Sequence, residues 1–126
     1  MKELKFYRCP HCGNIAQMVH DAGVVPVCCG EPMILLQANT SDGAGEKHVP
    51  DIHVVDNLVH VQIGEVVHPM LEEHHIEWIY LQTENGGQIK YLTVGSEPIA
   101  EFALHEDQLI AVYEYCNLHG LWKYSV

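Results

Sequence analysis

Apolar and polar residues alternate in short runs beyond residue 50. Turn-forming groups such as Asp56-Asn57 and Asn85-Gly86-Gly87 separate these runs, which are rich in β-branched and aromatic residues. The expected strands cover residues 52–55, 58–63, 76–82, 88–94, 99–104 and 109–115. No stretch sustains the period of about 3.6 residues that marks an amphipathic helix. The pattern therefore predicts an all-β fold, with an antiparallel β-sandwich in this part of the chain.

A small, polar and glycine-containing stretch over residues 37–45 separates the strand-rich part from a different N-terminal segment. We expect a domain boundary there, with a first domain over residues 1–37 and a second over residues 38–126. A segment as short as the first cannot bury enough apolar surface to fold without a metal or disulfides. Its four cysteines would supply a metal site.

The 126-residue chain has a net charge of −11, and the charge is unevenly distributed. Residues 1–40 are balanced, because Lys2, Lys5 and Arg8 offset Glu3, Asp21 and Glu31. All of the excess acidity therefore belongs to residues 41–126, which argues against nucleic acid or an anionic membrane as a partner. No apolar run approaches the roughly 18 residues of a membrane span, and the first twenty residues lack a signal-peptide core. We expect a cytoplasmic protein.

Four of the five cysteines lie close together near the N-terminus. An odd number in this spacing does not suit a disulfide framework, whereas metal thiolates in a reducing compartment fit it. In Cys9-Pro10-His11-Cys12-Gly13, two residues between the cysteines allow a tight turn to direct both sulfurs at one ion. Cys28 and Cys29 are adjacent, so both reach that ion only if the chain bends, with Gly30 available for the bend. The residues predict a distorted tetrahedral site for zinc or iron.

A second set of metal donors is scattered over the strand-rich part. It combines imidazoles and one thiolate from separate loops and strand ends: His48, His68, His74, Cys116 and His119. Rigid sandwiches commonly build metal sites in this way. Four imidazoles suit many divalent metals, and the added thiolate favours redox-active iron or copper over a structural ion.

The other histidines have simpler interpretations. His53 and His60 alternate with apolar residues on their strands, so we expect both to face solvent. Exposed, non-ligating side chains are also expected for His11, His20 and His105. His75 is ambiguous, because either of the adjacent residues His74 and His75 could be the ligand.

The chain resembles a desulfoferrodoxin, the two-iron form of superoxide reductase, over essentially its full length. The matching motifs occupy residues 7–15, 27–33, 46–50, 68–70, 76–79 and 114–120. The resemblance implies a desulforedoxin-like (rubredoxin-like) first domain with a distorted Fe(Cys)4 centre, followed by an immunoglobulin-like sandwich. That sandwich would hold an iron with four equatorial histidines and one axial cysteine. The family pattern selects His74 as the ligand and usually has an aromatic residue at the position of His75.

The resemblance also implies a function: one-electron reduction of superoxide to hydrogen peroxide at the ferrous second iron. Lys47 would attract the anion, although an ordinary surface lysine is the alternative. Glu46 resembles the family's glutamate that closes onto ferric iron, with an exposed loop carboxylate as the alternative. A rubredoxin-like protein is the implied electron donor, and we expect a homodimer.

Two other classes of function stay open from the residues alone. One is an electron-transfer or metal-binding module without catalysis, and the other is a structural zinc protein. A superoxide dismutase is a weaker alternative, because its metal must accept an electron from superoxide as readily as it gives one. A thiolate donor biases the metal against accepting that electron.

Overall fold

The computed structural model describes residues 3–40 and 45–126, except for the side chain of Glu46. The chain divides into two compact units, Met1–Gln37 and Ala38–Val126. Within the described residues the only helix is α1 (Gly45–His48), a single turn. None of the described helices is long and apolar enough to cross a membrane.

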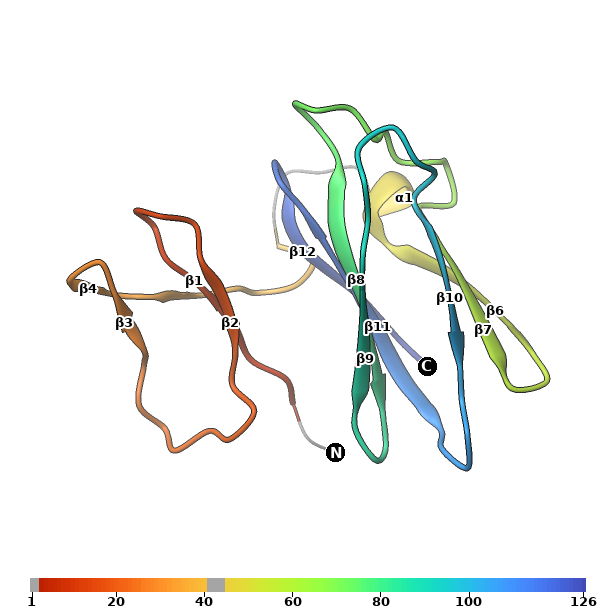
Figure 1. The fold of residues 1–126 in the computed structure, drawn as a ribbon, viewed down its shortest axis with the longest axis horizontal. Coiled ribbons are helices and arrows are strands. Elements are labelled where there is room, and N and C mark those ends of the chain that lie inside the picture. The colour runs from red at the N-terminus through yellow and green to blue at the C-terminus, as the bar shows by residue number, and fades with distance from the viewer. Residues whose placement is uncertain (1–2, 41–44) are drawn as a thin grey trace. The chain divides into compact units, whose positions relative to one another are not determined.

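The first unit is built from very short strands (Figure 1). One sheet has the order β2-β1-β5, and its strands are β1 (Phe6–Arg8), β2 (Ile15–Gln17) and β5 (Ile34–Leu35). A separate hairpin joins β3 (Val27–Cys28) to β4 (Glu31–Pro32). One buried cluster of this unit contains Tyr7, Cys9 and Met33, with Ala16, Met18 and Cys28 packed against it. Cysteine sulfur is therefore part of the core itself.

The second unit is an antiparallel sandwich of two sheets. Its strands are β6 (Pro50–Val55), β7 (Leu58–Ile63), β8 (Ile76–Thr83), β9 (Gly87–Tyr91), β10 (Ile99–Ala103), β11 (Leu109–Cys116) and β12 (Gly120–Ser125). One sheet has the order β10-β7-β6 and the other the order β12-β11-β8-β9. The chain crosses from the first sheet to the second after β7, returns for β10, and crosses again for β11, as in immunoglobulin-like folds. The predicted all-β fold is confirmed.

Alternation along the strands places the core between the sheets. On β7, Val59, Val61 and Ile63 are buried, while the residues between them are partly exposed. They pack in one cluster with residues of the facing sheet, among them Ile79 and Val112. Burial of each such side chain contributes roughly 1.5–3 kcal/mol, so the core holds the two sheets firmly together.

One end of this sandwich gathers α1, the start of β8 and the connection between β11 and β12 (Figure 1). Gly64 makes a close approach possible there. Its φ is 83°, and a Cβ at this position would lie 2.6 Å from the carbonyl oxygen of Lys47. A side chain would therefore push away the turn that carries Lys47 and His48.

A carboxyl group without a partner lies in the core of the second unit. Glu114 on β11 is fully buried, and neither of its carboxyl oxygens has a hydrogen-bond partner among the described residues. Burial raises the pKa of this carboxyl well above its usual value. The folded protein therefore keeps the proton to higher pH than the unfolded chain does. The contribution of the Glu114 carboxyl to stability is complete below the pKa that this group has in the unfolded chain. It is lost as pH rises through the higher pKa of the folded protein.

We predict that Glu114→Gln raises the free energy of unfolding at pH 8 by about 1–3 kcal/mol, because the amide never has to ionise in the core. The difference in free energy of unfolding between this variant and the parent should become smaller as pH falls toward the ordinary glutamate pKa. Urea unfolding of the iron-loaded protein at several pH values measures this. Glu97→Gln, at an exposed carboxylate, is the control and should show little change. A variant less stable than the parent at pH 8 would contradict the prediction.

Candidate metal centres

A turn directs Cys9 and Cys12 toward one point. The backbone N–H groups of His11 and Cys12 donate to Cys9 Sγ at 3.4 Å and 3.5 Å. The turn is closed by the hydrogen bond from Cys9 N to Asn14 O, and Gly13 adopts a φ of 80° within it. N–H donation to sulfur stabilises the thiolate, the form that binds metal.

The adjacent cysteines reach the same point through a tight hairpin. Cys28 pairs with Glu31 across β3 and β4, which leaves Cys29 and Gly30 as a two-residue loop. Both loop residues have positive φ, 53° for Cys29 and 76° for Gly30, as a type I′ turn requires. The bend that Gly30 was expected to allow is present, and Cys29 shares it.

The four sulfurs form what we call the sulfur cluster, whose donor atoms all lie within 4.8 Å of one another. The Sγ atoms of Cys12 and Cys28 are 3.7 Å apart, and those of Cys28 and Cys29 are 4.0 Å apart. Metal–sulfur bonds of about 2.3 Å in a tetrahedron give sulfur–sulfur edges of about 3.8 Å. All five cysteines of the chain are free thiols, so these contacts are not disulfides. The cluster fits a tetrahedral ion.

The thiols also compete for negative charge. Hydrogen bonds, chiefly from the backbone of Cys12, lower the pKa of Cys9 to about 6. Neighbouring thiols, with Cys12 first, raise the pKa of Cys29 to about 12. Without a cation the group therefore cannot ionise fully at neutral pH. An ion with at least two positive charges removes this conflict, as the donor set suggests.

Four imidazoles surround a second point at the end of the sandwich. Neighbouring rings are nearly perpendicular: His48–His68 at 4.6 Å, His68–His74 at 4.5 Å, His74–His119 at 5.0 Å and His119–His48 at 4.8 Å between centroids. The rings of His48 and His74, which are not neighbours in this circuit, are 6.2 Å apart. With Cys116, these residues form what we call the histidine–cysteine cluster.

Ring nitrogens of these histidines approach one another around the centre. His48 Nε2 is 3.1 Å from His68 Nε2 and 3.0 Å from His119 Nδ1. His68 donates its Nδ1 proton to the Pro69 carbonyl at 2.6 Å, so its Nε2 carries the lone pair. Burial lowers the pKa of His68 to about 4, which keeps the ring neutral. His74 Nε2 is buried and has no hydrogen-bond partner among the described residues. A cation at the centre would satisfy these nitrogens.

Cys116 adds a thiol to the four imidazoles. Its Sγ lies 3.6 Å from His68 Nε2 and 3.9 Å from His119 Nδ1. A register shift between Tyr115 and Cys116 where β11 pairs with β8 reorients the strand at this residue. Burial raises the pKa of the Cys116 thiol, so a thiolate there calls for a nearby cation. The donor atoms of His48, His68, His74 and Cys116 lie within 4.8 Å of one another, with His119 bordering the same centre.

Trp122 contacts two of the donor residues, the ring of His48 and the backbone of His119. Its ring stacks on His48 at 4.8 Å between centroids, and its Nε1 donates to the carbonyl of His119 at 3.1 Å. Sequence reasoning missed this residue. Its place on β12, three residues after the predicted donor His119, is the one signal that the sequence offers.

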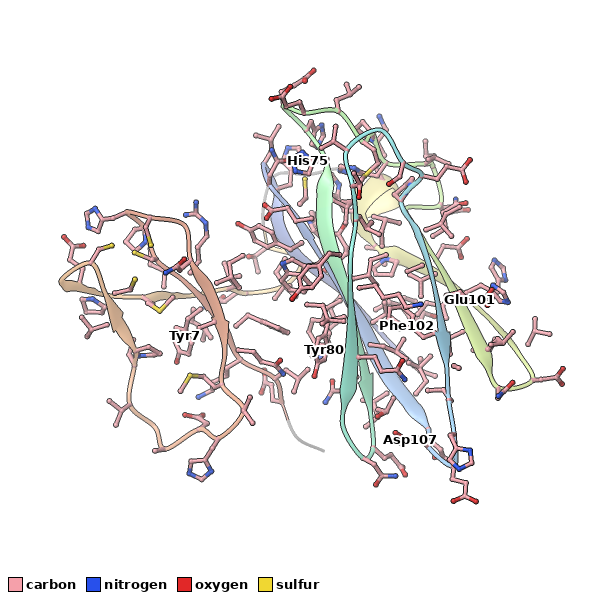
Figure 2. The ribbon with its side chains drawn as sticks, in the orientation of Figure 1. Tyr7, His75, Tyr80, Glu101, Phe102 and Asp107 are labelled. Atoms are coloured by element: carbon pink, nitrogen blue, oxygen red, sulfur yellow. The ribbon has the colours of Figure 1, made fainter. Side chains whose placement is uncertain are left out.

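His75 is held away from the cluster. Its Nδ1 lies 2.9 Å from the carbonyl of Leu71 and 3.1 Å from that of Glu72, and its backbone N–H donates to Asn117 Oδ1 at 2.9 Å. Figure 2 shows His75 where β8 begins. Because His75 is tied to carbonyls and its neighbour His74 faces the other imidazoles, the structure brings His74 and not His75 into the circuit.

The two residues expected to act on substrate precede His48 in α1. Lys47 is exposed, and its charge contributes, after burial and the neighbouring histidines, to lowering the pKa of His74. Its side chain therefore lies within electrostatic reach of the cluster. The side chain of Glu46 lies outside the described residues.

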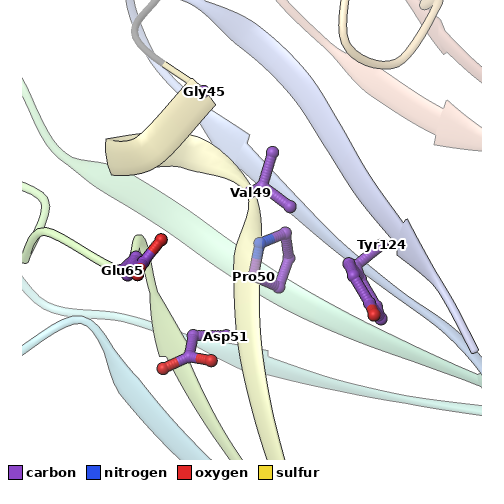
Figure 3. A pocket seen from close by; sticks show the side chains of 6 residues that line it. All are labelled: Gly45, Val49, Pro50, Asp51, Glu65 and Tyr124. Carbon is purple, nitrogen blue, oxygen red and sulfur yellow. The ribbon is translucent and has the colours of Figure 1, made fainter.

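A hollow of about 280 Å³ opens beside α1 but is not part of either cluster (Figure 3). It is lined by Gly45, Val49, Pro50, Asp51, Glu65 and Tyr124. Two of these side chains are carboxylates, so the hollow disfavours a small anion. The histidine–cysteine cluster is therefore the better candidate site for a small anion.

Comparisons with known proteins agree with this architecture. The family model described as "Desulfoferrodoxin, N-terminal domain" matches residues 1–36, and the model described as "Desulfoferrodoxin" matches residues 40–125. The desulfoferrodoxin of Nitratidesulfovibrio vulgaris is 50% identical over 121 residues, covering 96% of this chain and 95% of that protein.

Proteins named superoxide reductases are similar as well. The superoxide reductase of Pyrococcus horikoshii is 35% identical over 106 residues, which cover 69% of this chain and 91% of that protein. The crystal structure of the superoxide reductase from Treponema pallidum superposes with a TM-score of 0.84 at 38% identity. The match covers 98% of this chain and all of that one (100%).

An all-β scaffold with one all-thiolate cluster and one imidazole–thiolate cluster defines a metalloprotein with two separate centres of different chemistry. Within that class, the two family models and the long high-identity matches determine the group. The chain belongs to the desulfoferrodoxin family.

We predict that His74→Ala lowers the affinity of the histidine–cysteine cluster for iron by more than about tenfold, because it removes an inward-facing nitrogen. His75→Ala should leave iron content unchanged, since the hydrogen bonds of His75 go to backbone carbonyls and to the Asn117 side chain. Iron per chain in the two purified variants, measured under the same buffered iron concentration, decides between them. Loss of iron from the His75 variant alone would reverse the assignment.

Proposed function

We propose that this chain, a superoxide reductase by family, reduces superoxide at an iron held by five side chains: His48, His68, His74, His119 and Cys116. The single observation that supports this most is the circuit of four imidazoles closed by a buried thiol. Ferrous iron bound there supplies one electron, and two protons complete hydrogen peroxide. The other steps depend on the chain's own residues.

The residues of the histidine–cysteine cluster differ in their exposure to water. His48, His68 and Cys116 are buried, whereas His74 and His119 are partly exposed. The exposed side is where a small anion and protons from solvent can arrive. The Pro69 carbonyl holds the proton of His68 on the outer nitrogen, so this ring keeps its lone pair inward during turnover.

Lys47 is proposed to draw the anion to this exposed side. The chain carries a net charge of −11, which repels superoxide at long range. Salt screens distant carboxylates beyond about 8 Å, so a nearby ammonium dominates at short range. The influence of Lys47 on the pKa of His74 supports this placement. A role for Glu46 in closing the site after product release stays a prediction.

The sulfur cluster is proposed to hold a second iron through Cys9, Cys12, Cys28 and Cys29. This ion would stabilise a unit in which the buried hydrophobic cluster has three members, Tyr7, Cys9 and Met33. Cys12 and Cys29 are exposed, so a redox partner can approach the cluster closely. We propose a rubredoxin-like protein as that electron donor.

The assembly and location of the protein are part of the same proposal. Several apolar side chains of the first unit are exposed, including Val24 at 71% and Val27 at 66%, and a homodimer would cover such side chains. Free thiols in metal-binding spacing suit a reducing compartment, which supports a cytoplasmic location.

Cys9→Ser should remove the iron of the sulfur cluster and leave the other iron reactive, because the two donor sets share no residue. We expect the visible absorption of the all-thiolate iron to disappear and superoxide reduction with an artificial donor to stay within about twofold of the parent. Cys116→Ser is the matched variant, with the opposite expected pattern. Loss of the reaction in Cys9→Ser while the second iron is fully loaded would contradict a self-contained catalytic site.

Lys47→Ala should slow the bimolecular reaction with superoxide by about tenfold at low ionic strength, because local attraction of the anion is lost. Its rate should fall less with salt than that of the parent and could even rise as the acidic background is screened. Pulse radiolysis at low and high ionic strength measures both quantities.

Lys90→Ala removes the same charge from β9, away from the cluster, and is the control for the prediction on Lys47. It should react at nearly the parental rate with the parental salt dependence. Equal rates and equal salt slopes in Lys47→Ala and the parent would show that Lys47 does not steer superoxide.

A further inference from the structure

The outer face of the β10-β7-β6 sheet carries metal-donor side chains that neither cluster uses. His53 on β6 lies directly opposite His60 on β7, and Glu101 on β10 lies opposite His60 on its other side. The three residues therefore form one row across three strands, on one face. Figure 2 shows Glu101 directed away from the sandwich and its neighbour Phe102 directed into it.

Each histidine of this row already contacts a carboxylate. His60 Nδ1 lies 3.0 Å from Glu101 Oε2. His53 Nε2 lies 3.5 Å from Asp51 Oδ2, two residues earlier on the same face of β6. An imidazole held by a carboxylate on one nitrogen offers the other to a ligand, which is the arrangement found behind metal-bound histidines.

We propose that His53 and His60 form a surface site for a divalent transition metal ion of the zinc class, with Asp51 supporting His53 and Glu101 supporting His60. Directly opposed residues on antiparallel strands have Cβ atoms about 4.5–5.5 Å apart, so two imidazoles can bind one ion at about 2.0–2.1 Å. Imidazole selects zinc, nickel or copper over calcium and magnesium, which prefer oxygen donors. The remaining coordination positions belong to water.

Binding requires a small rearrangement. Among the described residues, only the two clusters already have donors gathered within 4.8 Å. The side chains of His53 and His60 are 73% and 41% exposed, so rotation about their χ angles meets little resistance. The site is therefore open and adaptable, unlike the enclosed clusters.

Local charge also favours a cation on this face. The excess acidity of the chain lies in residues 41–126, which include this sheet. Lys90 is the nearby positive charge, but it is directed to the backbone carbonyl of Glu101 and over the ring of Phe102 at 5.2 Å from the centroid. The Glu101 carboxylate itself is paired with His60. An ordinary pair of exposed ion pairs would account for these contacts without metal affinity, so metal binding is the distinguishing property.

The test is a calorimetric titration of the iron-loaded protein with Zn²⁺, while the visible absorption of the iron is followed to show that iron is not displaced. We expect the parent to bind one additional Zn²⁺ per chain at this face. His53→Gln and His60→Gln should each weaken this binding by about 10–100-fold, and Glu101→Gln should weaken it by up to about tenfold. None of these variants should change iron content or the reaction with superoxide.

His105→Gln is the matched control, because His105 is an exposed histidine in the loop after β10 and outside the row. It should bind Zn²⁺ like the parent. The proposal is overturned if the iron-loaded parent binds no additional Zn²⁺. Unchanged affinity in both His53→Gln and His60→Gln, or an equal loss in His105→Gln, would also overturn it.

Discussion

The second unit depends on one constraint: the polar donor atoms of the histidine–cysteine cluster must be held close together around one point. Inward-facing ring nitrogens approach to 3.0–3.1 Å, and one of them, His74 Nε2, is buried without a hydrogen-bond partner among the described residues. Buried polar atoms of this kind lack the water they would have in solution. Only a rigid frame can keep them together before a cation binds. The sandwich supplies that frame, because its core fixes the strand ends from which the donors project.

In the first unit the metal donors are not held by a separate rigid frame. Its buried cluster is small and includes Cys9 itself, so the metal donors are not mounted on a finished core. The ion would complete the core, and folding and metal binding would be one event there. In the second unit the core of Val59, Ile79, Val112 and their neighbours is much larger, and of the proposed donors only Cys116 belongs to it. We therefore expect metal loss to be far more disruptive in the first unit.

The sequence was informative wherever a local pattern determines the structure. Alternation located the strands of the sandwich, and Asp56-Asn57 forms the predicted turn, with Asp56 at a φ of 55°. Sequence spacing also singled out the cysteines and histidines that converge. It could not reveal α1, because one helical turn is too short to show a period, nor the support that Trp122 and the Pro69 carbonyl give to His48 and His68. These contacts join residues distant in sequence or use backbone atoms, which carry no residue signature.

Glu114 illustrates a further limit of pattern reasoning. β11 is buried on both faces, so alternation there does not distinguish inside from outside, and a glutamate in such a strand would ordinarily be assigned to the surface. Burial raises the pKa of the Glu114 carboxyl, and burial also raises the pKa of the Cys116 thiol, with a smaller contribution from the charge of Glu114. A protonated Glu114 would add no negative charge behind the thiolate, leaving the charge of the metal centre to its donors.

The donor sets themselves separate the two proposed functions by charge. A ferrous ion among four neutral imidazoles and one thiolate retains a single positive charge, which attracts superoxide. A ferric ion among four thiolates has a single negative charge, which repels it. With the proposed ligands, the anion would be drawn to one centre and kept from the other, even though the chain as a whole has a net charge of −11. Replacing an inward imidazole by a carboxylate would cancel the attraction, so neutral donors suit this substrate as much as they suit the metal.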